Sequence, residues 1–177
     1  MRAVRVVGGS ARGRPLVAPP GEWTRPTSDR VREAMFNALW SRGAVGGQRV
    51  LDLFAGSGAL GIEALSRGAV HATFVDAGRP ARHALRRNLE ACGFTDRAEI
   101  VGLAAERYLA RLKDEHFDLA FCDPPYAYSA WDRLLSSLPA DLVVIESDRP
   151  VTLPDGWELE RERRYGGTWL GFALSRR

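Results

Sequence analysis

The chain has 177 residues, a length typical of one domain, and 45% of them are hydrophobic, which is enough to fill an ordinary core. No apolar run approaches the length of a membrane-spanning helix, and Met1-Arg2-Ala3-Val4-Arg5 leads into glycines and arginines instead of a signal-peptide core. These features argue against a membrane protein and predict a cytoplasmic one. The two cysteines, Cys92 and Cys122, match no metal or disulfide spacing, so we expect no metal.

Basic charge is concentrated near the N-terminus. Residues 1–32 contain seven arginines and two acidic residues, a net charge of +5, whereas the whole chain has a net charge of +3. A local excess of this kind is typical of a surface that binds a polyanion. The alternative is a solvated arm with no partner.

The first elements predicted along the chain are short. A strand is expected near 4–7, followed by a glycine- and arginine-rich turn at 8–14 and an extended, proline-rich stretch. A helix then begins, because Thr27 or Ser28 can cap it and the apolar residues that follow lie on one helical face. Gly43 and the glycines after it end this helix.

From residue 49 the pattern alternates between strand and helix, which predicts a mostly parallel sheet covered on both faces. The tail differs, because two strands joined by a glycine turn read as an antiparallel hairpin. We therefore expect an α/β, Rossmann-like fold with a seven-stranded sheet over 28–177, preceded by a basic extension over 1–27. Strands are expected near 49–54, 71–76, 98–102, 117–122, 141–146, 157–164 and 168–175, and helices near 59–67, 79–91, 105–113 and 129–137.

A glycine-rich turn follows the first strand of the predicted sheet. The stretch Asp52-Leu53-Phe54-Ala55-Gly56-Ser57-Gly58 continues to Gly61, and Asp76 lies 20 residues after Gly56 at the end of the next strand. This spacing fits a dinucleotide site, in which an acidic residue accepts the ribose hydroxyls. Asp52 argues against a pyrophosphate, because its negative charge would repel phosphate and suits a cationic amine instead.

The stretch FCDPPY, residues 121–126, ends another predicted strand. Two prolines cannot donate backbone hydrogen bonds and hold the chain extended, so the Asp123 carboxylate and the Pro124 carbonyl are available as acceptors. Together with the Tyr126 ring they suit a flat ligand with an N–H group. Ligands of open α/β sheets bind at the carboxyl ends of the strands, where Gly56, Asp76 and Asp123 should meet. A ligand with a ribose and an ammonium group, such as S-adenosylmethionine, fits this edge.

Four blocks of sequence resemble known methyltransferases, two of them general motifs and two of them specific to one family. D-L-F-A-G-S-G is similar to the first motif of class I methyltransferases, and D-P-P-Y to the catalytic motif of enzymes that methylate exocyclic nitrogens. Residues 5–16 and 25–37 look like the RsmD-type family, which methylates guanine N2 in bacterial 16S rRNA, and the resemblance covers essentially the whole chain.

The resemblance implies roles for particular residues. Asp123, Pro124, Pro125 and Tyr126 would be catalytic, with the first two accepting the amine hydrogens and Tyr126 stacking on the base. S-adenosylmethionine would be bound, without a metal, by Asp52, Phe54, Ala55, Gly56, Ser57, Gly58, Asp76 and Ala105. The chain departs from many methyltransferases at Leu103-Ala104-Ala105, which offers no polar side chain for the adenine amine, so a backbone N–H near Ala105 would have to serve.

The implied partner is small-subunit rRNA, in a partly assembled 30S particle, and we expect a monomer with no membrane contact. Arginines of the N-terminal region would bind its phosphates, and our candidates are Arg5, Arg12, Arg14, Arg25 and Arg30. Three alternatives stay open. They are an adenine-N6 DNA methyltransferase, which would share D-P-P-Y, a non-catalytic RNA-binding assembly factor on the same scaffold, and an NAD-dependent enzyme.

Overall fold

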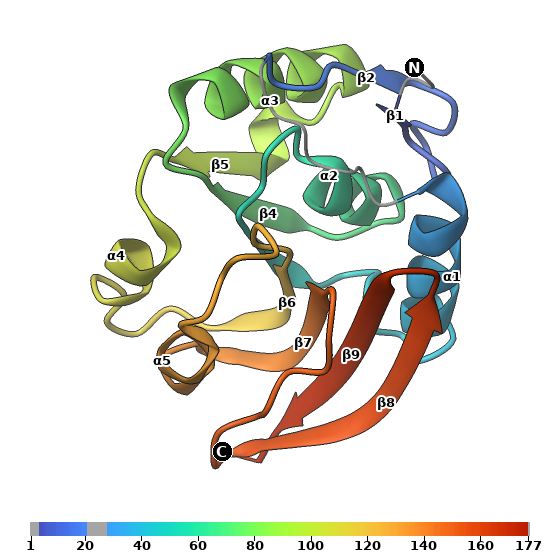
Figure 1. Cartoon of the computed structure of the whole chain (residues 1–177). Coiled ribbons are helices and arrows are strands. Elements are labelled where there is room, and N and C mark those ends of the chain that lie inside the picture. Colours follow the sequence, from blue (N-terminus) through green and yellow to red (C-terminus); the bar gives the residue numbers. More distant parts are fainter. Residues whose placement is uncertain (1–3, 21–27, 177) are drawn as a thin grey trace.

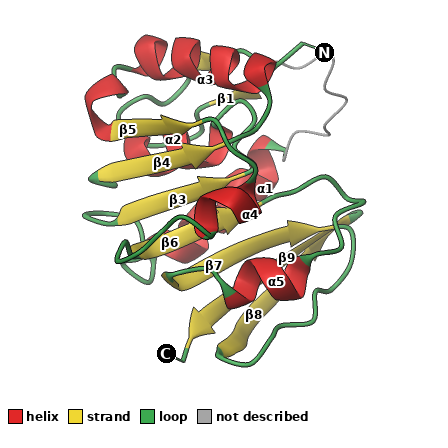
Figure 2. Cartoon of the chain, turned by 90° about the vertical axis from the view of Figure 1, so that its left-hand side faces the viewer, coloured by secondary structure: helices red, strands yellow, loops and turns green. Residues whose placement is uncertain are grey.

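The computed structural model describes residues 4–20 and 28–176. Their main feature is a seven-stranded sheet with the order β5-β4-β3-β6-β7-β9-β8, seen face-on in Figure 2. Neighbours from β5 to β7 are parallel, whereas β9 is antiparallel to both β7 and β8. This confirms the predicted parallel sheet with its closing hairpin. The strands are β3 (Arg49–Leu53), β4 (His71–Val75), β5 (Ala98–Val101), β6 (Phe117–Cys122), β7 (Ala140–Ser147), β8 (Trp157–Tyr165) and β9 (Thr168–Ser175).

Helices cover both faces of the sheet, as Figures 1 and 2 show. One face packs against α1 (Asp29–Trp40), α2 (Ala59–Ser66) and α3 (Arg79–Cys92). The other packs against α4 (Ala105–Leu109) and α5 (Trp131–Ser136). A short 3-10 turn, Thr95–Arg97, precedes β5. None of the helices in the described residues is long and apolar enough to cross a membrane.

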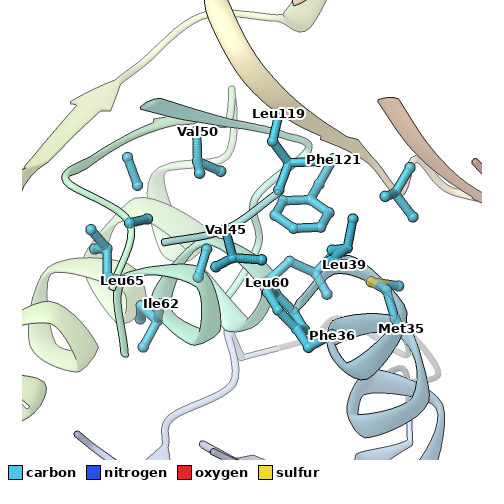
Figure 3. Close-up of a cluster of buried hydrophobic side chains, with 14 of the residues drawn as sticks. Met35, Phe36, Leu39, Val45, Val50, Leu60, Ile62, Leu65, Leu119 and Phe121 are labelled. Atoms are coloured by element: carbon cyan, nitrogen blue, oxygen red, sulfur yellow. The ribbon is translucent and has the colours of Figure 1, made fainter. Parts of the chain in front are cut away.

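The core between the sheet and the first three helices is tightly packed (Figure 3). Phe36 of α1 lies against Phe121 of β6, with ring centroids 5.5 Å apart. At Gly61 of α2, an added Cβ would lie 2.3 Å from the Phe74 ring of β4, so only glycine lets the helix approach the sheet this closely. The start of α2 is thereby held against the carboxyl edge of the sheet.

Most predicted boundaries are correct to within two residues, and one helix is shorter than predicted. The Ser28 hydroxyl accepts a hydrogen bond from the Val31 amide at 3.3 Å, so Ser28 caps α1 as expected. The helix predicted over 105–113 ends at Leu109. There the hydrogen bonds tighten to an i to i+3 pattern, with Arg111 N donating to Tyr108 O.

Residues 4–20 pack against the domain as a small two-stranded ribbon, β1 (Val4–Arg5) with β2 (Pro15–Leu16). The predicted strand over 4–7 is shorter because the Val7 and Gly8 amides donate to the Glu63 carboxylate of α2, each at 2.8 Å. Val6 is buried in the same core as α1 and α2. The proposed division at residue 27 falls outside the described residues.

Candidate active site

The turn between β3 and α2 has an unusual backbone. Phe54, Gly56 and Gly58 all have positive φ angles, of 63°, 54° and 80°. This conformation is accessible to glycine, but it strains Phe54, and such strain is common where a backbone is shaped to hold a ligand. An added Cβ at Gly58 would lie 2.2 Å from Leu85, so the turn also lies close to α3. The predicted glycine turn thus has its backbone amides at the carboxyl edge of the sheet.

Asp76 follows β4 and faces this turn. Its Oδ2 accepts a hydrogen bond from Gly56 N at 2.8 Å, and its Oδ1 accepts one from Gly78 N at 2.7 Å. Each carboxylate oxygen can accept a further hydrogen bond. The structure therefore brings Asp76 and Gly56 together, as their spacing predicted, and Asp76 keeps acceptor capacity for a pair of hydroxyls.

Asp52 is buried, although the sequence led us to expect its carboxylate at the ligand-binding edge of the sheet. Its side chain is only 2% exposed, and Oδ2 accepts a hydrogen bond from Gly61 N at 2.9 Å. Burial raises the pKa of Asp52 to about 8, although the hydrogen bond from Gly61 opposes the shift. A largely protonated carboxyl behind the turn is not placed as a free anion for an ammonium group, and its part in cofactor binding stays a prediction.

The D-P-P-Y segment follows β6 at the same edge. Cys122, the last residue of β6, pairs with Leu53 of β3 and with Ile145 of β7. The next residue of each chain segment, Phe54, Asp123 or Glu146, therefore lies at the same height along the sheet. Asp123 is half-buried, Pro124 is buried, and Tyr126 is 40% exposed. In the described part of the chain, no donor reaches the Asp123 carboxylate or the Pro124 carbonyl, whereas Pro125 O accepts a turn bond from Tyr128 N.

Asp123 and two other acidic residues lie on one side of the sheet. Asp52, Asp123 and Glu146 all face the layer of α1, α2 and α3, because alternate residues of a strand share a face. Burial and the neighbouring Glu146 and Asp52 carboxyls raise the pKa of Asp123 well above its usual value. Glu146 is itself 3% exposed. Asp123 thus holds a proton more strongly than an ordinary carboxyl.

An aromatic cluster flanks the turn on the α4 and α5 side. The Tyr128 ring contacts Phe54 and Trp131 edge-on, with both centroid distances at 5.2 Å. Its hydroxyl donates to Glu106 at 2.6 Å. Glu106 is therefore engaged by Tyr128 in this structure. Ala105, the first residue of α4, is buried, and its amide is among those that have no partner within a helix.

The predicted RNA-binding arginines differ in their surroundings. Arg5 pairs with Asp29 at 3.1 Å, whereas Arg12, Arg14 and Arg30 are exposed, and Arg25 lies outside the described residues. Among the described residues, no ion pair involves Arg12, Arg14 or Arg30. Their role in binding stays a prediction.

Two polar residues that the sequence patterns did not single out connect α2, α3 and the glycine turn to the N-terminal segment. Asn88 of α3 is 1% exposed, and its Nδ2 donates to Ser57 O in the glycine turn at 2.8 Å and to Val17 O at 2.9 Å. Glu63 of α2 is fully buried and binds Arg67 at 2.8 Å besides the two N-terminal amides. A polar residue at an apolar helix position was the available signal for both, but the sequence does not tell which partner it meets.

The described residues contain no group of three or more His, Cys, Asp or Glu side chains placed to hold a metal ion.

Comparison with known proteins identifies the family. The family model described as "Conserved hypothetical protein 95" matches residues 4–173. The chain is also 35% identical to Ribosomal RNA small subunit methyltransferase D of Haemophilus influenzae, with 92% of this chain and 89% of that protein covered. The Escherichia coli K12 protein of the same name is 37% identical over 92% of this chain and 85% of its own length. This chain belongs to the RsmD family.

Solved structures share the fold of this chain. A structure described as "Putative methyltransferase yhhF from Escherichia coli" superimposes with a TM-score of 0.85 at 35% identity, and the match covers 98% of each chain. A hypothetical protein of Thermus thermophilus gives a TM-score of 0.83 at 35% identity, covering 96% of this chain and 98% of its own. The class I methyltransferase fold predicted from the sequence is therefore confirmed.

Proposed function

We propose that this RsmD-family protein transfers a methyl group from S-adenosylmethionine to the exocyclic N2 of a guanine in small-subunit rRNA. The observation that supports this most is the position of Asp123 and Pro124. Their acceptor atoms follow β6 directly beside the turn that follows β3. A nitrogen bound there would lie next to the methyl donor. The names of the similar proteins support rRNA as the substrate class.

The residues around the glycine turn fit S-adenosylmethionine. Asp76 has acceptor capacity for the ribose hydroxyls, and the positive φ angles of Phe54, Gly56 and Gly58 bring the backbone close to a ligand. Ala55 and Ser57 complete this turn, and the Ala105 amide is a candidate donor to the adenine ring. When bound, the cofactor supplies an electrophilic methyl group on a positively charged sulfur.

The chain's own residues would activate the amine. The N2 lone pair of guanine is delocalised into the ring, so N2 is a poor nucleophile. Asp123 and the Pro124 carbonyl would hold the two amine hydrogens, which turns the lone pair toward the methyl carbon. As N2 takes up the methyl group that the cofactor would supply, Asp123 would accept one N2 proton, so that the methylated base is left neutral. Pro124 and Pro125 hold the acceptors in place beforehand, so little alignment is lost during reaction.

The RNA would be positioned by groups at this edge and on the N-terminal segment. A target base must leave its stack to reach Asp123, and the exposed Tyr126 ring is free to stack on it. Arg5, Arg12, Arg14, Arg25 and Arg30 would bind phosphates, which positions the RNA without reading its sequence. We place this activity in the cytoplasm, on a partly assembled small subunit, with the protein acting as a monomer.

Methyl transfer from labelled S-adenosylmethionine to under-methylated small subunits tests the proposal, with the modified nucleoside identified by chromatography. Wild type, Asp123→Ala and an exposed control on α5, Asp132→Ala, would be compared. We expect N2-methylguanosine from wild type and the control, and a loss of at least a hundredfold from Asp123→Ala.

Other products would decide between the alternatives. N6-methyladenosine would overturn the guanine assignment and keep the site. Cofactor binding without transfer to subunits, free rRNA or DNA would favour a non-catalytic RNA-binding module. Binding of NAD in place of S-adenosylmethionine, measured by calorimetry, would overturn the cofactor assignment.

A further inference from the structure

The outward face of α3 is basic and has no ion-pair partners among the described residues. Arg79, His83, Arg86 and Arg87 are exposed and recur at helical spacing along one face, on which Glu90 is the acidic residue. The opposite face packs into the core. No salt bridge within the described residues involves Arg79, Arg86 or Arg87. Three guanidinium groups are therefore presented to solvent outside any ion pair among the described residues.

The N-terminal ribbon continues this basic surface. Asn88 holds it against α3, because its Oδ1 accepts from Val17 N at 2.8 Å and its Nδ2 donates to Val17 O at 2.9 Å. Burial raises the pKa of Cys92, and the charge of Arg14 opposes that shift, which places Arg14 near the C-terminal end of α3. Figure 1 shows β2 beside the same end. Arg14 thus extends the row that begins at Arg79.

The exposed strand β8 mixes the two signs of charge. β8 carries three glutamates close to two arginines, namely Glu158, Glu160 and Glu162 with Arg161 and Arg163. Two of these glutamates are also paired, Glu160 with Arg42 and Glu158 with Arg176 at 2.9 Å. A mixed surface is typical of a solvated face, whereas a row of arginines outside ion pairs suits a chain of phosphates. α3 and the ribbon differ from β8 in this respect.

We propose that Arg79, Arg86 and Arg87 of α3, together with Arg14, bind the phosphates of the RNA that flanks the target nucleotide. We call these four residues the α3 surface. The inference rests on the proposed function and extends it to a helix outside the basic N-terminal segment. α3 has 14 residues and is therefore about 21 Å long, which spans several phosphates.

The position of the α3 surface relative to the reaction site is fixed by two features. Arg79 begins α3 three residues after Asp76, so one end of the surface adjoins the cofactor edge. Asn88 donates to Ser57 O at 2.8 Å and to Val17 O at 2.9 Å, which ties the glycine turn, the helix and the ribbon together. RNA held along α3 would therefore enter the site at a constant angle.

A matched pair of double variants tests the proposal. Arg86→Ala with Arg87→Ala removes two charges from the α3 surface, and Arg161→Ala with Arg163→Ala removes two from β8. Binding to under-methylated small subunits and to a fragment of their rRNA would be measured across a range of salt concentrations. We expect the α3 variant to weaken binding about tenfold or more, and to reduce the slope of log K against log salt by about 0.7 for each phosphate that is no longer neutralised. The β8 variant should change neither.

Further measurements separate this inference from the proposed function. The α3 variant should bind S-adenosylmethionine as wild type does, with an unchanged unfolding midpoint, and should raise KM for RNA while leaving kcat nearly unchanged. Replacement of both arginines by lysine should restore most of the binding. Unchanged affinity and slope in the α3 variant, or an equal loss in the β8 variant, would overturn the α3 surface even if wild type methylates guanine. Failure of wild type to methylate RNA, with the slopes as expected, would overturn the activity and retain the surface.

Discussion

Asp76 and Gly56 are joined by a hydrogen bond of 2.8 Å from the Gly56 amide to Asp76 Oδ2, although 20 residues separate them. The same carboxylate also accepts from Gly78 N at 2.7 Å, so one side chain links the turns that follow β3 and β4. It both shapes the glycine turn and presents acceptors at the edge where we place the ribose. Asp76 is thus the residue on which the proposed cofactor site depends most.

Asp76→Ala should therefore weaken S-adenosylmethionine binding by about tenfold to a hundredfold. Loss of hydrogen bonds to a charged group costs about 1.5–3 kcal/mol, and the released turn adds to the loss. Calorimetric titration of the variant measures this directly. The exposed Asp96→Ala, on the 3-10 turn before β5, is the matched control and should bind as wild type does. Equal affinities for wild type and Asp76→Ala would remove Asp76 from the site.

Glu146→Gln should move the pH dependence of activity toward lower pH. Burial is the largest cause of the raised pKa of Asp123, and the Glu146 carboxyl is the larger of the two acidic causes. If Asp123 must be ionised to take the amine proton, kcat/KM rises with pH through the pKa of Asp123 in the free enzyme. Removing the Glu146 charge lowers that pKa, so the rise should begin at a lower pH. A merely structural role would reduce the rate without moving the profile, which distinguishes the two.

Asp52→Asn should remove part of the loss of stability at high pH. The pKa of Asp52 is raised from 3.8 to about 8, so in this window the folded chain retains a proton that the unfolded chain has released. The free energy of unfolding therefore falls as pH rises, by up to about 1.4 kcal/mol per pH unit, and levels off above the folded pKa. Urea unfolding at about pH 5 and about pH 9 should show the variant less sensitive to pH than wild type. An identical pH dependence in the two proteins would contradict the raised pKa.

Glu63→Gln should loosen the N-terminal ribbon and lower stability by about 3–5 kcal/mol. Glu63 is fully buried and accepts from the Val7 and Gly8 amides and from Arg67. Breaking a buried charged contact leaves its partners without compensation. Hydrogen exchange at the Val7 and Gly8 amides should accelerate more than exchange in β6. The exposed Glu90→Gln serves as the control and should leave both rates unchanged.

The sequence by itself determined the order and type of the elements. Alternating strand and helix patterns, the glycine turn and the capping Ser28 are local signals, because the period of apolar residues and the backbone needs of a turn act over a few neighbouring residues. They were sufficient for the parallel sheet with its hairpin and for the meeting of Gly56 with Asp76. They were less reliable for the end of α4, where tighter hydrogen bonds end the helix early.

Only the tertiary structure decided which distant side chains meet. Glu146 lies beside Asp123 because Cys122 pairs with Ile145 across β6 and β7, and this register is set by packing over the whole sheet. Asn88 joins Ser57 to Val17, and Glu63 holds the first residues, only once α2 and α3 are docked on the sheet. Such contacts depend on the relative placement of elements far apart in the chain, which no local pattern encodes.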